Sequence, residues 1–283
     1  MCNQDRQRVR ETIANYTLFD DAFMSEVFNE NNELTQYVLR IILQRDDLEV
    51  TSVASQREIG SLASRGVRLD IEAIDSKGNY YDVEVQRARK PGLPQRARFY
   101  QSMMDYEHVE KGEDFQFMRR SYIIFILDYD LYGEQKPIYH VDYIIRENGK
   151  PYDDGREILF VNGTYRNRDE DIGRLMHDFS CSDYHQIDSE LIRETVRPYK
   201  EPYSKEGDKM SELVERIFRE DYEKLRAEHA RELAESNQKL AESNHKLSEI
   251  EERLARLEQI ISEKDEEISS LKKALADQGV KQS

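Results

Sequence analysis

Three polar side chains on two neighbouring predicted strands could bind a divalent cation. Residues 67–75 and 80–86 alternate apolar and polar side chains, and a turn joins them, so together they predict a β-hairpin. In that hairpin Asp70 faces the same side as Glu84, with the Gln86 amide alongside. Carboxylate oxygens suit Mg²⁺ or Mn²⁺, which can acidify a water and neutralise charge on a phosphodiester. The spacing is thus compatible with metal-dependent phosphodiester hydrolysis, and the alternative is an ordinary hairpin whose polar face is solvated.

A cluster of positive charges follows the second strand of this hairpin. It stands out in a chain of net charge −16, and its members are Arg87, Arg89, Lys90, Arg96 and Arg98. Phosphate backbones favour such clusters through counterion release, and the guanidinium fork matches phosphate geometry. We therefore expect DNA contact here, although a solvated loop that offsets nearby acids would have the same composition. Arg96 and Tyr100 lie on one face of a predicted helix and could both point into the cleft, or Tyr100 could belong to the core.

The elements that must position these residues indicate a mixed α/β domain. Apolar residues at helical spacing follow Asp20 and Asp21, which resemble an N-cap pair, and an amphipathic helix should run from the prolines at 91 and 94 to about residue 111. Residues 121–128 form a continuous apolar run, typical of a central strand that is buried on both faces. Further strands are expected near residues 137–146 and 156–162, and further helices near 168–179 and 187–197.

The composition changes after residue 203, which divides the chain into a predicted globular domain (1–203) and a helical tail (204–283). Between Asp208 and Gln278 there is no glycine or proline. Apolar residues recur there at every seventh position: Leu233, Leu240, Leu247, Leu254, Ile261, Ile268 and Leu275. A seven-residue apolar repeat favours a left-handed coiled coil, and hence a homo-oligomer. A solvated single helix with charge pairs four residues apart is the alternative.

Several other classes of protein and site are disfavoured. The longest apolar run has six residues, too few to cross a bilayer, and no signal peptide is visible, so we expect a cytoplasmic protein without membrane contact. Two cysteines, Cys2 and Cys181, exclude a disulfide scaffold or a cysteine-rich zinc site. The glycines form no phosphate-binding loop, and the histidines show no metal-ligand spacing. The acidic balance argues against a polycation that coats nucleic acid, but not against a nuclease, whose site needs acidic ligands.

Four motifs in order resemble a known family over about residues 15–200. Asp70, followed after thirteen residues by Glu84-Val85-Gln86, resembles the PD-(D/E)XK nuclease superfamily in its E-x-Q variant. Residues 19–28 resemble the opening D-x-x-F-K-x-x-F helix of the recombination-promoting nuclease (Rpn) and putative transposase family, although Met24 replaces the usual lysine. Its R-x-x-x-Y-x-S helix is matched from Arg96 through Tyr100, and a buried strand followed by Asp-Tyr-Asp comes next.

This resemblance implies a restriction-endonuclease-like core, which is a mixed sheet flanked by helices. It also implies which residues bind the metal ion. Asp70 and Glu84 would bind the metal, together with the Val85 carbonyl. The acid from the first helix would be Asp20, with Glu26 as second candidate, and an N-cap role is the alternative for Asp20. Gln86 stands where many relatives have a catalytic lysine. A glutamine can orient water or phosphate by hydrogen bonds, but it carries no charge and cannot act as a general base.

The sequence therefore predicts a metal-dependent DNA endonuclease of the transposase-like family, with Mg²⁺ or Mn²⁺ as cofactor and DNA as substrate. Asp70, Glu84 and Gln86 are the predicted catalytic residues. The predicted DNA contacts are Arg87, Arg89, Lys90, Arg96 and Tyr100. A different hypothesis is a catalytically weak or inactive member that acts by binding DNA or by coiled-coil interactions.

Overall fold

The computed structural model describes residues 9, 11–60, 66–109, 111–201 and 204–279, which divide into two units, Met1–Arg216 and Ile217–Ser283. In chain order the elements are α2 (Asp21–Phe28), α3 (Asn32–Leu43), β1 (Val50–Ile59), β2 (Val67–Asp75), β3 (Tyr80–Gln86), α4 (Leu93–His108), the 3₁₀ turn η1 (Phe115–Phe117), β4 (Ser121–Leu127), β5 (Ile138–Val141), β6 (Arg156–Asn162), α5 (Asp171–Ser180), the 3₁₀ turn η2 (Tyr184–Gln186), α6 (Glu190–Lys200) and α7 (Lys205–Gly279).

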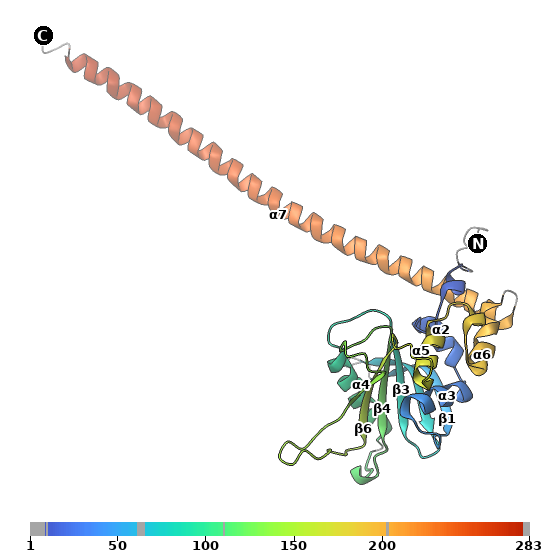
Figure 1. Cartoon of the computed structure of the whole chain (residues 1–283). Coiled ribbons are helices and arrows are strands. Elements are labelled where there is room, and N and C mark those ends of the chain that lie inside the picture. Colours follow the sequence, from blue (N-terminus) through green and yellow to red (C-terminus); the bar gives the residue numbers. More distant parts are fainter. Residues whose placement is uncertain (1–8, 10, 61–65, 110, 202–203, 280–283) are drawn as a thin grey trace. The chain divides into compact units, whose positions relative to one another are not determined.

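The first unit contains a mixed six-stranded sheet with helices on both faces (Figure 1). The strand order is β1-β2-β3-β4-β6-β5; β3, β4 and β6 run parallel, and the other neighbours are antiparallel. Helices α2, α3, α5 and α6 pack in the apolar core on one face, and α4 packs in the core on the other. The predicted mixed sheet flanked by helices is confirmed.

Strand β4 joins the two cores, as its apolar run predicted. All seven of its residues are buried, because β3 and β6 flank it and both of its faces are covered. Ile124 and Ile126 belong to the core of α2 and α5, while Ile123 and Phe125 belong to the core of α4. Parallel pairing also brings the carboxyl ends of β3 and β4 together, with Gln86 beside Leu127.

The turn between β2 and β3 is organised by the buried carboxylate of Asp75. It accepts hydrogen bonds from the backbone N–H groups of Lys77 and Asn79 at 2.9 and 2.8 Å, and from the Tyr81 hydroxyl at 2.8 Å. Burial alone would raise the pKa of Asp75, but the hydrogen bonds from Asn79, Tyr81 and Lys77 outweigh it and hold the pKa below its ordinary value. The turn fixes the register of the hairpin.

The alternation of β2 is interrupted at Asp70, where the sequence predicted a regular strand. Leu69 and Ile71 were expected on one face, but Leu69 packs in the core of α4 and Ile71 in the opposite core. On β1, Gln56 lies between the partners of these two residues and has a left-handed φ of 51°. The pairing of β2 with β3 ends at the same place, at Ile71 and Val83. The sheet is therefore irregular where the predicted site lies.

Several peripheral elements differ from the expected boundaries. The strand expected at 137–146 is limited to β5, and residues 142–155 form a largely exposed connection to β6. The two helices expected near 168–179 and 187–197 are present as α5 and α6, each starting about three residues later. No described helix is long and apolar enough to cross a membrane.

Helix α7 begins two residues after the boundary predicted at residue 203. Its first turns complete the core of the first unit, because Met210 and Val214 are fully buried there. The compact unit accordingly extends to Arg216. Further along, the described residues of the seven-residue repeat, such as Leu254 and Ile261, are about half exposed or more in the single chain.

Replacing Asp75 by alanine should destabilise the hairpin, because several donors would lose a charged acceptor. We expect a loss of about 2–3 kcal/mol in urea denaturation at pH 7. Because the pKa of Asp75 is lowered in the folded state, its contribution is present above the unfolded value and is lost as pH falls through the folded value. The difference between wild type and variant should therefore shrink in acid. The exposed Asp46→Ala is the control and should unfold with wild type; equal unfolding of Asp75→Ala would contradict this role.

Candidate functional site

Asp70 and Glu84 meet where the β2–β3 ladder opens. The Asp70 N–H donates to Glu84 Oε1 at 2.9 Å, and the Val85 N–H donates to Asp70 Oδ2 at 3.2 Å. Each carboxylate thus accepts a backbone N–H from the neighbouring strand where a carbonyl would otherwise accept it. Both side chains are more than nine-tenths buried, yet both line a pocket of about 850 Å³. The predicted convergence of these two residues is present.

The electrostatics of this pair leave negative charge uncompensated. Burial raises the pKa of Asp70, and the neighbouring charges of Glu84 and Asp21 raise it further. Burial also raises the pKa of Glu84, although the Asp70 N–H and the Arg96 charge act in the opposite direction. Buried carboxyls whose charged forms are disfavoured are what a cation would stabilise. The donor set therefore fits a hard divalent cation.

A third buried acid, Asp82, lies on the same strand face, two residues before Glu84. It is completely buried, and burial followed by the charges of Glu84 and Asp70 raises its pKa well above the ordinary range. Apart from the Glu84 carboxyl, its oxygens have no hydrogen-bond partner among the described residues. Burial and the neighbouring acids therefore favour the neutral form of Asp82.

The first helix contributes Asp21, whereas the sequence favoured Asp20. The Asp21 carboxyl reaches the Asp70 carboxyl, and it also lies 3.7 Å from Arg68. Asp20 lies at the N-cap position without a side-chain capping bond. Its carboxylate accepts the Thr17 N–H at 2.8 Å and pairs with Arg87. Both acids line the pocket, but Asp21 is the one whose charge acts on the buried pair.

The Gln86 amide is engaged on both sides. Its Oε1 accepts a hydrogen bond from the Arg96 guanidinium at 2.5 Å, and its Nε2 donates to the Tyr129 hydroxyl at 2.5 Å. The contact with Tyr129 follows from the parallel pairing, which places the residues after β4 beside the end of β3.

The predicted DNA contacts divide into two groups. Arg87, Lys90, Arg96 and Tyr100 line the pocket. Arg89 does not; its guanidinium donates to the backbone carbonyls of Asp130 and Leu131 and lies 4.7 Å from the centroid of the Tyr129 ring. Most of the basic cluster therefore adjoins the buried acids.

Sequence reasoning missed three residues of this site, for different reasons. Asp21 was grouped with Asp20 as a capping pair, and nothing local showed which carboxyl would reach Asp70. The alternation of β3 placed Asp82 beside Glu84, but it could not show that no donor would reach it. Tyr129 could be found only from the parallel pairing of β3 and β4.

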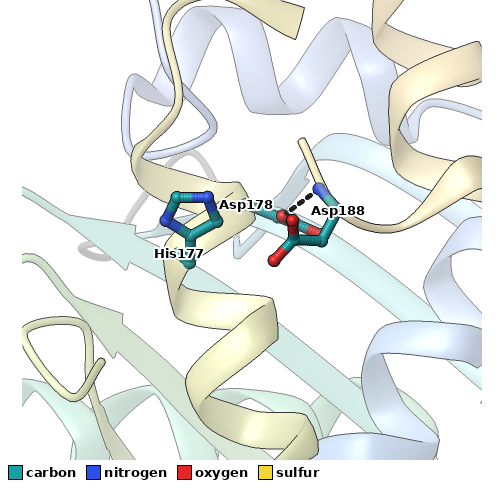
Figure 2. Close-up of side chains that lie close together, drawn as sticks. All are labelled: His177, Asp178 and Asp188. Atoms are coloured by element: carbon teal, nitrogen blue, oxygen red, sulfur yellow. Dashed lines mark hydrogen bonds between the residues drawn. The ribbon is translucent and has the colours of Figure 1, made fainter. Parts of the chain in front are cut away.

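A second group of ligand-type side chains joins the end of α5 to the start of α6 (Figure 2). Single ligand atoms of His177, Asp178 and Asp188 lie within 4.8 Å of one another. Asp178, however, accepts the Asp188 N–H at 2.7 Å, and the Asp188 carboxylate pairs with Arg168. His177 Nε2 lies 3.1 Å from the Gln186 carbonyl. We interpret this group as a structural link whose members already have protein partners.

Comparison with known proteins gives one match. A sequence model of the family described as PD-(D/E)XK nuclease family transposase matches residues 19–172, just over half of the chain. This span contains all the residues that line the pocket. No curated protein and no solved structure gives a significant match.

The buried acids should make the metal-free protein less stable as pH rises. Their pKa values are raised, so the folded state holds protons that the unfolded chain releases near pH 4, and this stabilisation is lost as pH rises through the folded values. In EDTA, the melting temperature should fall between about pH 5 and pH 8.5. Asp82→Asn should reduce the fall, because a neutral amide has no proton to lose, whereas the exposed Asp169→Asn should not. Equal slopes in all three proteins would contradict the assignment.

Proposed function

Because the chain belongs to the family described as PD-(D/E)XK nuclease family transposase, we propose that it is a metal-dependent DNA endonuclease that hydrolyses phosphodiester bonds. The observation that carries this proposal is the convergence of Asp70 and Glu84, with Asp21 alongside, on one pocket that basic residues also line. A nuclease of this family needs a cation site beside a phosphate site, and the pocket offers ligands for both.

In this proposal Asp70 and Glu84 hold the cation, and Asp21 takes the place that the sequence favoured for Asp20. When bound, Mg²⁺ or Mn²⁺ supplies a Lewis acid that acidifies water and neutralises charge on the phosphate. The residues of the chain bind the cation and orient its ligands. The Asp70 and Val85 N–H groups fix the two carboxylates. The raised pKa of Asp82, caused by burial and by the charges of Glu84 and Asp70, favours its neutral form and so limits the negative charge at the site.

The proposed substrate is DNA, and the basic side chains around the pocket would bind its backbone. The Arg87 guanidinium is held beside the pocket by the carboxylate of Asp20 at 2.5 Å and by that of Asp128 at 3.7 Å. Lys90 and Arg96 line the same pocket. Phosphate contacts of this kind position the strand without reading its sequence.

Removing either buried ligand should abolish cleavage. With Mg²⁺ or Mn²⁺, wild type should nick plasmid DNA, and Asp70→Ala or Glu84→Ala should lower the rate by at least about 100-fold, because a cation site needs both carboxylates. The exposed Asp169→Ala is the control and should cut like wild type.

Melting curves separate chemistry from folding in this experiment. Without metal, each alanine variant removes one of two buried carboxyls that repel each other, but it also leaves a buried N–H without its acceptor. Because these two effects oppose each other, both variants should remain folded, with only a small net change in melting temperature. Cleavage that persists in folded Asp70→Ala with an unchanged metal response would refute the assignment. A wild type that binds DNA but never cuts it would support the alternative of an inactive, DNA-binding member.

We further propose that the chain has two parts, a nuclease domain and a tail that forms a homo-oligomeric coiled coil. The exposed apolar residues of the seven-residue repeat support this, because a single helix leaves them in water. Two copies would also bring two sites to one duplex, as a double-strand break requires.

Charges placed in the predicted seam should dissociate the oligomer. Leu254→Asp combined with Ile261→Asp would bury carboxylates between helices, which is strongly unfavourable unless the helices separate. Light scattering at tens of micromolar should report an oligomer for wild type and a monomer for this variant. Gln259→Asp combined with Ser262→Asp adds the same charge outside the seam and should stay oligomeric. A monomeric wild type would argue against self-association.

A further inference from the structure

The cleft of the proposed nuclease lacks a lysine at Gln86, and the structure shows which cation lies nearest to that position. The Gln86 carbonyl oxygen accepts from Arg96, and its amide nitrogen donates to Tyr129. Both groups of the amide therefore already have a protein partner. The Gln86 amide thus holds the Arg96 guanidinium in the pocket that Asp70 and Glu84 also line.

Arg96 is further fixed by its aromatic neighbours. Its guanidinium carbon lies 4.9 Å from the centroid of the Phe125 ring and 5.8 Å from that of Tyr100. Phe125 is fully buried in β4, so this support is rigid. Arg96 lies in the first turn of α4, and it lines the same pocket as Asp70 and Glu84.

One further observation indicates that the Arg96 guanidinium is directed at a ligand. Its Nε is buried and has no hydrogen-bond partner among the described residues. Arg87 and Arg89, by contrast, have carboxylate or carbonyl partners. A half-buried guanidinium whose buried Nε–H has no acceptor favours an anion that can accept it, and phosphate oxygens do so.

We propose that Arg96 is a catalytic residue, which contacts the scissile phosphate and supplies the positive charge that Gln86 lacks, while Gln86 and Tyr129 position it. This inference rests on the proposed nuclease function. In the hydrolysis, a water oxygen forms a bond to phosphorus, the bond to the leaving sugar oxygen breaks, and the proton of the water passes to solvent as the leaving oxygen is protonated. Arg96 makes no covalent bond and moves no proton, since a guanidinium stays charged. It stabilises negative charge that develops on the phosphoryl oxygens.

The test separates this role from simple DNA binding. Arg96→Ala and Arg96→Lys are compared with wild type in single-turnover cleavage with Mg²⁺ and in DNA binding with Ca²⁺ by fluorescence anisotropy. Arg96→Ala should lose about 100-fold or more in rate at saturating protein, as when one transition-state donor is removed. Its dissociation constant should rise by less than tenfold, since a single phosphate contact would be lost. Arg96→Lys, which keeps the charge but not the fork, should fall between the two proteins.

Added guanidinium ion provides a readout that a merely structural role would not change. At millimolar concentrations below those that unfold the protein, it should restore part of the cleavage rate of Arg96→Ala. It should not accelerate wild type or Arg146→Ala, in which an exposed arginine outside the pocket is removed. Melting temperatures show whether each variant is folded, and Arg96→Lys provides the comparison if Arg96→Ala is not.

The outcomes distinguish this inference from the function on which it rests. If wild type cuts DNA and folded Arg96→Ala cuts at the same saturated rate, Arg96 is not catalytic, although the nuclease assignment stands. A rate loss without guanidinium rescue, matched by an equal loss in Arg96→Lys, would assign Arg96 to structure. If wild type does not cut DNA under any of these conditions, both proposals fail.

Discussion

The site depends on how the β2–β3 ladder ends. Two antiparallel strands normally continue to pair through backbone groups, but here the last pair is Ile71 with Val83. Beyond it, the Asp70 and Glu84 carboxylates accept the N–H groups of the opposite strand. Buried N–H groups need acceptors, so the two carboxylates stabilise the unpaired ends of β2 and β3. The same hydrogen bonds place both carboxylates between the two strands. The Asp75 turn fixes the register on which the exchange depends.

Buried acids on this part of the sheet differ in whether a cationic side chain pairs with them. Glu72 is buried, but hydrogen bonds from His108 and Arg57 hold its pKa below the ordinary value. Asp70 and Glu84 are buried to a similar degree, yet burial raises their pKa values and neighbouring acids raise them further. The charge of Arg96 opposes this only at Glu84. A protein that needed only a stable sheet would gain by pairing these acids as it pairs Glu72. The unpaired acids are therefore the feature that distinguishes a cation site from a structural network.

Much of the fold followed from patterns within single segments. The hairpin, the buried strand β4 and the long tail helix were predicted because period-two alternation, an apolar run and the absence of glycine and proline are each local properties. The pairing of Asp70 with Glu84 was predictable for the same reason, since a short turn fixes which residues face each other. The motif order was likewise sufficient to indicate the family that the match over residues 19–172 shows.

Local patterns along the chain are therefore enough to predict the hairpin, its two acids and a nearby basic cluster. Which of these residues act together depends on how the elements pack, because the contacts between them join segments far apart in the chain. Asp21 rather than Asp20 reaches Asp70, since the orientation of α2 against β2 chooses between adjacent carboxyls. Gln86 binds Arg96 and Tyr129 because α4 and the residues after β4 both pack near the end of β3. Burial, which sets the charge of each acid, exists only once these elements have packed.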